Sequence, residues 1–242
     1  MEHAQAGALA APLPAGTLPV AASNWLRSGQ ASAQQQGNTL TIKQASNQAI
    51  LNWQSFNIAR GSSVVFAQPD SSAQVLNRIA DASPSVIQGA LQSNGRVYLI
   101  NRNGIVFGQG AQVNVGGLVA STLDISDDLF LAGALSNTPG NPAFNDAANA
   151  GFVRIEAGAS LTTASGGSVW LFAPSIEQGG VISTPDGQTL LAAGKAVYLS
   201  ASDDAAMRGV KVEVSSGGSV INLGQIVAER GNATLAGLAV NQ

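Results

Sequence analysis

The residues of this chain that could do chemistry are few, and most of them are carboxylates. Asp124, Asp127 and Asp128 form one group, and Asp203 and Asp204 form a second. Clustered carboxylates can bind calcium or carry out acid–base work on polysaccharides. Both pairs of adjacent aspartates fall in turn-like segments, where acidic side chains are usually solvated, and the alternating Asp and Gly of a calcium loop is missing. We therefore expect no catalytic residue and no enzyme.

Histidine and cysteine chemistry is also nearly excluded. His3 is the only histidine and lies in a segment without strand pattern, and the chain has no cysteine. We expect no metal ligand and no cofactor. A chain without cysteine suits export in an unfolded state through an oxidising compartment, because stray disulfides would block threading there.

The composition is typical of an extracellular, repetitive all-β protein. Charged residues make up 10% of the chain, against roughly 25% in ordinary globular domains, and 28 glycines and many small polar residues take their place. The hydrophobic share of 45% is high enough to build a core and argues against disorder. The net charge is −3 and no basic run interleaves with aromatic residues, so we expect no nucleic-acid partner.

Strand signals begin after residue 36. Residues 1–36 are rich in Ala, Pro, Ser and Gln, and we expect an extended leader and cap segment anchored by Trp25 and Leu26. Thr39 to Ile42 then alternate with period two, which indicates a half-buried strand. Residues 77–92 interrupt this strand pattern and are expected to hold a short helix or a loop excursion.

The most regular part of the chain has strand cores spaced eight residues apart, at Val97/Leu99, Ile105/Phe107 and Val113/Val115. An antiparallel meander with Asn–Gly turns could give this spacing, and so could the faces of a β-helix. Loose Gly-x-Val-x-Leu repeats in residues 167–171, 195–199 and 232–235 favour a solenoid, whose units are roughly 20–30 residues long. Residues 127–150 interrupt the repeats, which predicts a loop or hairpin excursion there.

Five blocks carry a resemblance to a known family: residues 37–42, 49–58, 76–79, 95–108 and 116–125. In this order they resemble the filamentous-haemagglutinin-type N-terminal secretion domain, the TPS domain of two-partner-secretion exoproteins. The resemblance covers about residues 37–126, and weaker repeats continue through residues 151–242 as further coils. It implies an all-β, right-handed parallel β-helix with an N-terminal cap.

The resemblance also implies a place and a partner. Such a domain belongs to a large, adhesin-like exoprotein, secreted or held at the surface of a Gram-negative bacterium after passing through the periplasm. Its partner is an outer-membrane β-barrel transporter with POTRA domains. The domain is expected to be a monomer that is recognised by the transporter and nucleates β-helix folding outside the cell.

Two short motifs, residues 101–105 and residues 77–78, are the candidate secretion and transporter-recognition sites. The family's Asn-Pro-Asn-Gly-Ile motif has Arg in place of Pro here, and its Asn-Pro-Asn-Leu motif is absent. A structural role competes with recognition, because Asn–Gly tolerates positive φ and an asparagine can bond its own backbone. Likewise, Arg78 of the motif at residues 77–78 could cover a neighbouring coil with its aliphatic stem. The candidate residues are Asn77, Arg78, Asn101, Arg102, Asn103, Gly104 and Ile105.

Trp53 and Phe56 are expected to form the core of the cap. One end of a β-helix exposes unpaired strand edges that must be covered, and bulky residues near the N-terminus suit that role better than a ligand platform. The alternative function is a module that binds carbohydrate or a host surface through an outer face or the 127–150 excursion, with host or matrix glycans also possible through downstream regions. A polysaccharide-active enzyme is the weakest alternative.

Overall fold

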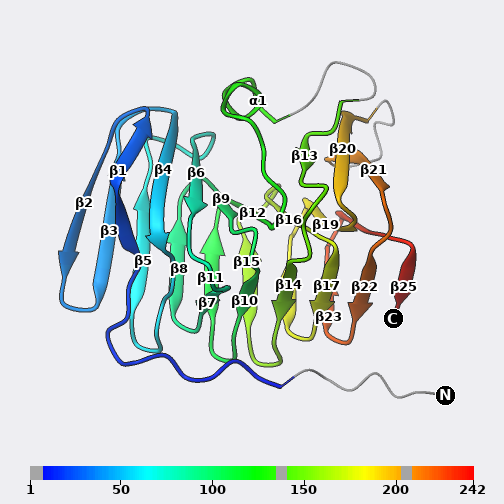
Figure 1. The fold of residues 1–242 in the computed structure, drawn as a ribbon, viewed down its shortest axis with the longest axis horizontal. Coiled ribbons are helices and arrows are strands. Elements are labelled where there is room, and N and C mark those ends of the chain that lie inside the picture. Colours follow the sequence, from blue (N-terminus) through cyan, green and yellow to red (C-terminus); the bar gives the residue numbers. More distant parts are fainter. Residues whose placement is uncertain (1–7, 135–140, 203–208) are drawn as a thin grey trace.

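The backbone winds into a stack of coils, drawn as a ribbon of a computed structural model in Figure 1. The structure describes residues 8–134, 141–202 and 209–242, so His3 and the pair Asp203–Asp204 lie outside the described residues. A complete coil contributes one strand to each of three sheets, which we call B, A and C in the order in which the chain visits them.

Each of these sheets runs along the stack. Sheet A contains β1 (Val20–Ser28), β4 (Gln48–Ser55), β6 (Gln74–Ile79), β9 (Arg96–Ile100), β12 (Gly117–Ser121), β16 (Ser168–Ala173), β19 (Gln188–Ala193) and β24 (Asn232–Ala236). Sheet B contains β2 (Ala31–Gln36), β3 (Thr39–Gln44), β5 (Ser63–Ala67), β8 (Ala90–Ser93), β11 (Gln112–Val115), β15 (Ser160–Thr163), β18 (Val181–Ser183) and β23 (Gln225–Val227). Sheet C contains β7 (Ser85–Ile87), β10 (Ile105–Phe107), β14 (Phe152–Ile155), β17 (Ser175–Gln178), β22 (Ser219–Asn222) and β25 (Ala239–Asn241).

Inward-pointing apolar side chains stack in columns from coil to coil. In sheet A the parallel register places Val97 between Val75 and Leu118, and Val169 follows in the same column. All four side chains are fully buried, and burying each contributes roughly 1.5–3 kcal/mol. The three cores spaced eight residues apart lie in β9, β10 and β11, which are successive faces of one winding. The predicted parallel β-helix is confirmed.

Sheet A is buried on both faces, and this explains its continuous apolar runs. Every residue of β16 and β19 is buried, whereas β11 of sheet B alternates between exposed and buried residues. A sheet covered on both sides loses the period-two pattern. The outer face of sheet A carries a second core, in which Tyr98 and Phe172 pack against residues from outside the coils.

Two excursions cover that outer face, and both leave the coil between a strand of sheet A and a strand of sheet C. The first contains the short helix α1 (Asp127–Leu131) and β13 (Phe144–Asn145). The second contains β20 (Ala196–Ala201) and β21 (Val210–Ser215), which pair antiparallel. β13 pairs with β20 to make a small sheet D, which Figure 1 draws together with α1 above the coils.

Residues 195–199 were expected to be a strand of the coil repeat, within the 151–242 segment of further coils, and that expectation is wrong. They fall in β20 of the second excursion and pair with β13 and β21 rather than with the coils. The physical reason is that a hairpin strand with one covered face has the same alternation as a coil strand. Residues 77–92 likewise hold the end of β6, all of β7 and the first three residues of β8 in place of a helix or loop. Strands of three or four residues are too short for a period to show.

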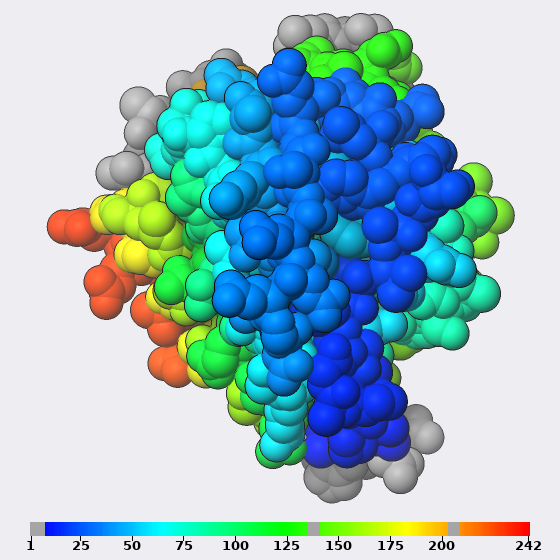
Figure 2. All heavy atoms as spheres, turned by 90° about the vertical axis from the view of Figure 1, so that its left-hand side faces the viewer, coloured from blue at the N-terminus to red at the C-terminus, as the bar shows by residue number. Residues whose placement is uncertain are grey.

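The N-terminal end of the stack is closed by two antiparallel strands. β1 pairs with β4 and β2 pairs with β3, in the opposite sense to the parallel coils, and Figure 2 shows these residues spread over the end of the molecule. Trp25 of β1 packs edge-on against Trp53 with ring centroids 5.8 Å apart, and Trp53 packs edge-on against Phe56 at 5.3 Å. Leu26, the expected second anchor, is instead 43% exposed.

The leader ahead of β1 lies along the outside of the coils, as Figure 1 shows at the lower edge of the stack. The backbone N–H of Ala10 donates to Glu156 Oε1 at 2.5 Å, and that of Leu13 donates to Gln88 Oε1 at 2.9 Å. Leu18 then enters the core. No helix among the described residues is long and apolar enough to cross a membrane.

The outer core gives a direct test of the role of α1. Phe130 is fully buried and packs edge-on against Tyr98 at 5.2 Å, whereas the neighbouring Leu131 is 42% exposed. We expect Phe130→Ala to lower the free energy of unfolding by about 3–5 kcal/mol because it leaves a cavity over sheet A. Leu131→Ala should change it by less than about 0.5 kcal/mol. Urea unfolding followed by circular dichroism measures both, and equal effects would contradict the covering role.

Candidate functional site

Residues 101–104 form a tight turn between β9 and β10, and Ile105 is the first residue of β10. The side-chain oxygen of Asn101 accepts from the backbone N–H of Asn103 at 3.0 Å, and the N–H of Gly104 donates to the carbonyl of Asn101 at 3.1 Å. The side-chain amide of Asn101 donates to the Ser83 carbonyl at 3.1 Å and to Ser85 Oγ at 3.0 Å. Asn101 is fully buried, so it ties the turn to the preceding coil.

Gly104 and Ile105 fit this turn into the stack. Gly104 has φ +128°, and a Cβ there would lie 3.2 Å from both Phe152 Cε1 and Pro84 Cβ. Glycine is therefore required twice, for its backbone conformation and for the close approach of neighbouring coils. Ile105 is fully buried and is the register partner of Ser85 on one side and Val153 on the other.

Asn77 lies in an inward column of the core. Its register partners are Leu51 and Leu99, and it is fully buried. Its side-chain oxygen accepts from the indole N–H of Trp53 at 2.8 Å, and its amide donates to the carbonyl of Tyr98 at 3.0 Å. A buried amide needs such partners. The motif at residues 77–78 is thus joined to the cap through Trp53.

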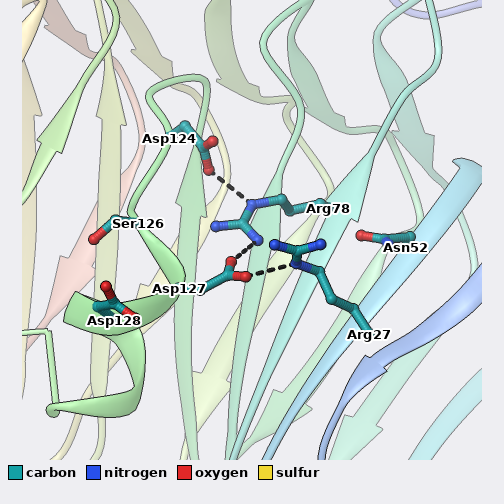
Figure 3. Close-up of a pocket in the computed structure, with 7 residues that line it drawn as sticks. All are labelled: Arg27, Asn52, Arg78, Asp124, Ser126, Asp127 and Asp128. Atoms are coloured by element: carbon teal, nitrogen blue, oxygen red, sulfur yellow. Dashed lines mark hydrogen bonds and ion pairs between the residues drawn. The ribbon is translucent and has the colours of Figure 1, made fainter.

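Arg78 points the other way, onto the outer face beneath α1 (Figure 3). Its guanidinium pairs with Asp124 at 3.0 Å, with Asp127 and with the carbonyl of Ile125. Asp127 also pairs with Arg27 of β1 at 2.5 Å. Asp127 was expected in a solvated turn, but the two arginines hold it at the start of α1. This ion-pair network joins the cap, sheet A and the first excursion.

The ion-pair network shifts the pKa values of Arg78 and Asp127 in the directions that favour their charged forms. Burial disfavours the charged form of Arg78, yet Asp124 and Asp127 raise its pKa. Burial likewise opposes ionisation of Asp127, but hydrogen bonds from Arg27 and Arg78 hold its pKa below the usual 3.8. Asp127 is therefore ionised and paired at neutral pH, which makes it a structural anchor with no proton to exchange.

Arg102 brings the two motifs together at the surface. It pairs with Asp146 at 2.9 Å and lines a hollow of about 480 Å³ that Arg78 and Asp124 also line. Asn103, its neighbour, donates its side-chain amide to the Asp81 carbonyl at 2.7 Å. We call the surface formed by Arg78, Arg102, Asp124 and Asp146 the arginine surface.

Sequence reasoning missed Arg27 and Asp146. Arg27 lies 100 residues from Asp127 along the chain, and its segment was interpreted as a leader without chemistry. Asp146 lies in the excursion, where no strand pattern marks it. The only sign of a role for Arg27 and Asp146 in the sequence was that each is a single charged residue in a segment with few charges.

The role of Asn77 can be tested by removing its amide without removing its volume. Asn77→Leu leaves the buried Trp53 indole N–H without its partner and removes the hydrogen bond to the Tyr98 carbonyl. We therefore expect the free energy of unfolding to fall by about 2–4 kcal/mol. In an Asn77→Leu/Trp53→Phe double variant one orphaned donor is gone. The two substitutions should therefore cost less together than the sum of the single losses in urea unfolding. Additive losses would mean that the 2.8 Å bond contributes nothing.

The Asp127 network predicts a pH dependence. Because the pKa of Asp127 is lowered in the folded state, its contribution is present above about pH 4 and disappears as the pH falls through the folded value. We expect Asp127→Asn to cost about 1 kcal/mol at pH 7 and much less near pH 3. Asp128→Asn is the matched control, because Asp128 shares the first turn of α1 and has no ion pair among the described residues. A cost that does not change between the two pH values would contradict the network.

The chain is similar to several known proteins. A heme/hemopexin-binding protein of Haemophilus influenzae is 42% identical over 97 residues, which are 40% of this chain and 11% of that protein. A second heme/hemopexin-binding protein from the same species is 46% identical over 86 residues, or 36% of this chain and 9% of that protein. The chain thus spans a small part of these relatives.

A solved structure and a family model cover far more of the chain. The crystal structure of the HMW1 secretion domain from Haemophilus influenzae matches with a TM-score of 0.76 and 31% sequence identity, covering 90% of this chain and 56% of that one. The model of the TPS secretion domain matches residues 14–239. The capped parallel β-helix of this chain is therefore that of the TPS secretion domain family, to which the chain belongs.

Proposed function

We propose that this chain is the part of a larger exoprotein that an outer-membrane transporter recognises, and that it then nucleates folding of the exoprotein outside the cell. The partner is a β-barrel with periplasmic POTRA domains, as the family resemblance implies. The supporting observation is that antiparallel strands cap the N-terminal end of the stack, so that a further coil can pair only with the other end. The capping strands are β1 and β2, while β23, β24 and β25 each lie at the end of a sheet.

The open end suits the addition of further coils. Leu223 and Leu238 of the last coil are 60% and 86% exposed, and the outer edges of its strands have no partner strand among the described residues. A coil that docks there gains parallel backbone hydrogen bonds and apolar burial at each step. Folding of this kind outside the cell would disfavour movement of the chain back through the transporter. It would therefore drive export without ATP.

The position of the motif residues suggests when recognition occurs. Asn77, Asn101 and Ile105 are fully buried in the folded coils, so a transporter can contact their side chains only before the coils form. Arg78 and Arg102 remain on the arginine surface after folding. We infer that Asn77 and Asn101 are read on the unfolded chain, and that their role in the folded state is to close the coil.

The function of the whole exoprotein lies beyond this chain. We propose a secreted or surface-held protein of a Gram-negative bacterium. An adhesin-like role and heme or hemopexin binding, the latter by analogy with the Haemophilus relatives, both belong to segments downstream. The second candidate function is a glycan-binding β-helix, which is favoured by one cavity of the outer face described below. We do not propose an enzyme, since Asp124 and Asp127 of the first acidic group are ion-paired with Arg78.

The first experiment is secretion of this chain, preceded by a signal peptide, from a Gram-negative host with and without the transporter of its own exoprotein. Release into the medium that requires the transporter is the expected result. Release without it would contradict recognition, and so would retention in both strains while the protein accumulates intact in the periplasm. A transporter from an unrelated system is the matched control and should not release the chain.

A pair of glycine variants tests whether coil closure and secretion are linked. Gly104→Asn places a side chain at φ +128° against neighbouring coils, and we expect it to lower the free energy of unfolding by about 1–3 kcal/mol and to reduce secretion. Gly37→Asn is the control, because φ is +56° with open space around it and asparagine tolerates that conformation. Normal secretion of a destabilised Gly104→Asn chain would separate recognition from folding and contradict the nucleation step.

A further inference from the structure

The outer face of sheet A has a second cavity, which shares no lining residue with the arginine surface. Its volume is about 340 Å³, and its walls include Arg96, Ser168, Trp170, Asp186 and Gln188 together with several glycines. Arg96 begins β9, Ser168 and Trp170 belong to β16, and Gln188 begins β19. Because β12 lies between β9 and β16, the cavity spans four successive coils. The size is at the small end of ligand pockets.

Arg96 has no carboxylate partner among the described residues. Its guanidinium carbon lies 5.3 Å from the centre of the Trp170 ring. Its polar contacts are the neutral hydroxyl of Tyr98 and Ser168 Oγ, the latter at the long distance of 3.5 Å. Arg27, Arg78, Arg102, Arg154 and Arg230 all pair with a carboxylate. Stacking on an aromatic ring orients a guanidinium and leaves its edge N–H groups available for a planar acceptor.

Trp170 provides a second unfilled donor on the same wall. Its indole N–H is buried and has no hydrogen-bond partner among the described residues, while the whole residue is only 4% exposed. Buried polar groups normally find partners, and one without a partner needs an explanation. An acceptor bound beside Arg96 would supply one.

The remaining polar side chains of the cavity are already engaged. Gln188 accepts from the N–H of Val210 at 3.1 Å and donates to its carbonyl at 2.8 Å. Asp186 accepts two hydrogen bonds from Arg230, at 2.9 and 3.0 Å, and a third from Ser165. The open hydrogen-bonding capacity therefore lies with Arg96, Trp170 and the hydroxyl of Ser168.

We propose that this cavity binds the carboxylate of an acidic sugar, such as a uronic acid residue of a polysaccharide. Arg96 holds the carboxylate through two parallel N–H···O bonds, the arrangement that a guanidinium favours. Ser168 and the indole N–H of Trp170 bind the oxygens beside it. The carboxylate of Asp186, which Arg230 already holds, also lines the cavity. Its negative charge disfavours a ligand with several negative charges, such as phosphate, and so favours a single carboxylate. This site does not depend on the secretion proposal.

The experiment follows the indole N–H resonance of Trp170 in ¹⁵N-labelled protein, assigned with the Trp170→Phe variant, during titration with D-glucuronate. We expect a saturable shift with D-glucuronate and none with D-glucose, which has a CH₂OH group in place of the carboxylate. Arg96→Gln should weaken binding about tenfold or more because the paired charge is lost. Arg60→Gln is the matched control: Arg60 is also without a carboxylate partner among the described residues but lies elsewhere, and its substitution should leave binding unchanged.

Three outcomes would overturn the proposal: no saturable shift with D-glucuronate, equal binding of acetate, or unchanged binding in Arg96→Gln. Equal binding of acetate would mean that the cavity accepts any carboxylate and does not recognise the sugar. Circular dichroism of each variant checks that the β-helix is intact. Should Arg96→Gln fail to fold, Ser168→Ala removes a single hydroxyl from the same wall and should weaken D-glucuronate binding without affecting the response to D-glucose.

Discussion

Stacking of each coil in register on the coil before it is the constraint on which the rest of this protein depends. A parallel β-helix has no local hydrogen bonding that holds one coil by itself, since every strand bonds to strands a full coil away. The register is set by inward columns such as Val75, Val97 and Leu118. A slip of one residue would turn each of these side chains outward. The cap, the excursions and the surface sites all keep the positions that this register gives them.

The column that contains Asn77 connects the stacking to the cap. A polar side chain in an apolar column is costly unless its hydrogen bonds are made, and here they are made to Trp53 and to the backbone of the next coil. Trp53 in turn packs between Trp25 and Phe56. One buried amide therefore fixes the orientation of the ring on which the capping strand rests, so that the first coils and the cap form one unit.

The outer face of sheet A is where the fold gains its individual features. Both excursions dock there, and the Arg27–Asp127–Arg78 ion pairs connect the first of them to the cap across the edge of the sheet. The same face carries the cavity around Arg96 at some distance from the motif residues. Asn77 and Asn101 are buried and hold the coils together, whereas Arg78 and Arg102 lie on the outside of the coils, where each pairs with carboxylates of the first excursion or its start.

The sequence by itself determined the fold class and most of the inward positions. Eight-residue spacing and glycine-marked turns, as around Val97 and Ile105, are local patterns that a repeated strand–turn geometry imposes on the chain. The block similarity assigned the motif turn at Asn101–Gly104. The short strands β7 and β8 and the hairpin β20–β21 could not be assigned, because three-residue strands carry no period and a hairpin strand alternates as a coil strand does.

Only the tertiary structure decided which charged and polar side chains meet. Arg27 reaches Asp127, and Arg96 lies over Trp170, through strands that are distant in sequence and adjacent only after stacking. Period and composition report whether a residue faces inward or outward, and they carry no information on which residue of another coil or excursion it faces. Those pairings depend on coil register and on the paths of the two excursions, which are properties of the whole folded chain.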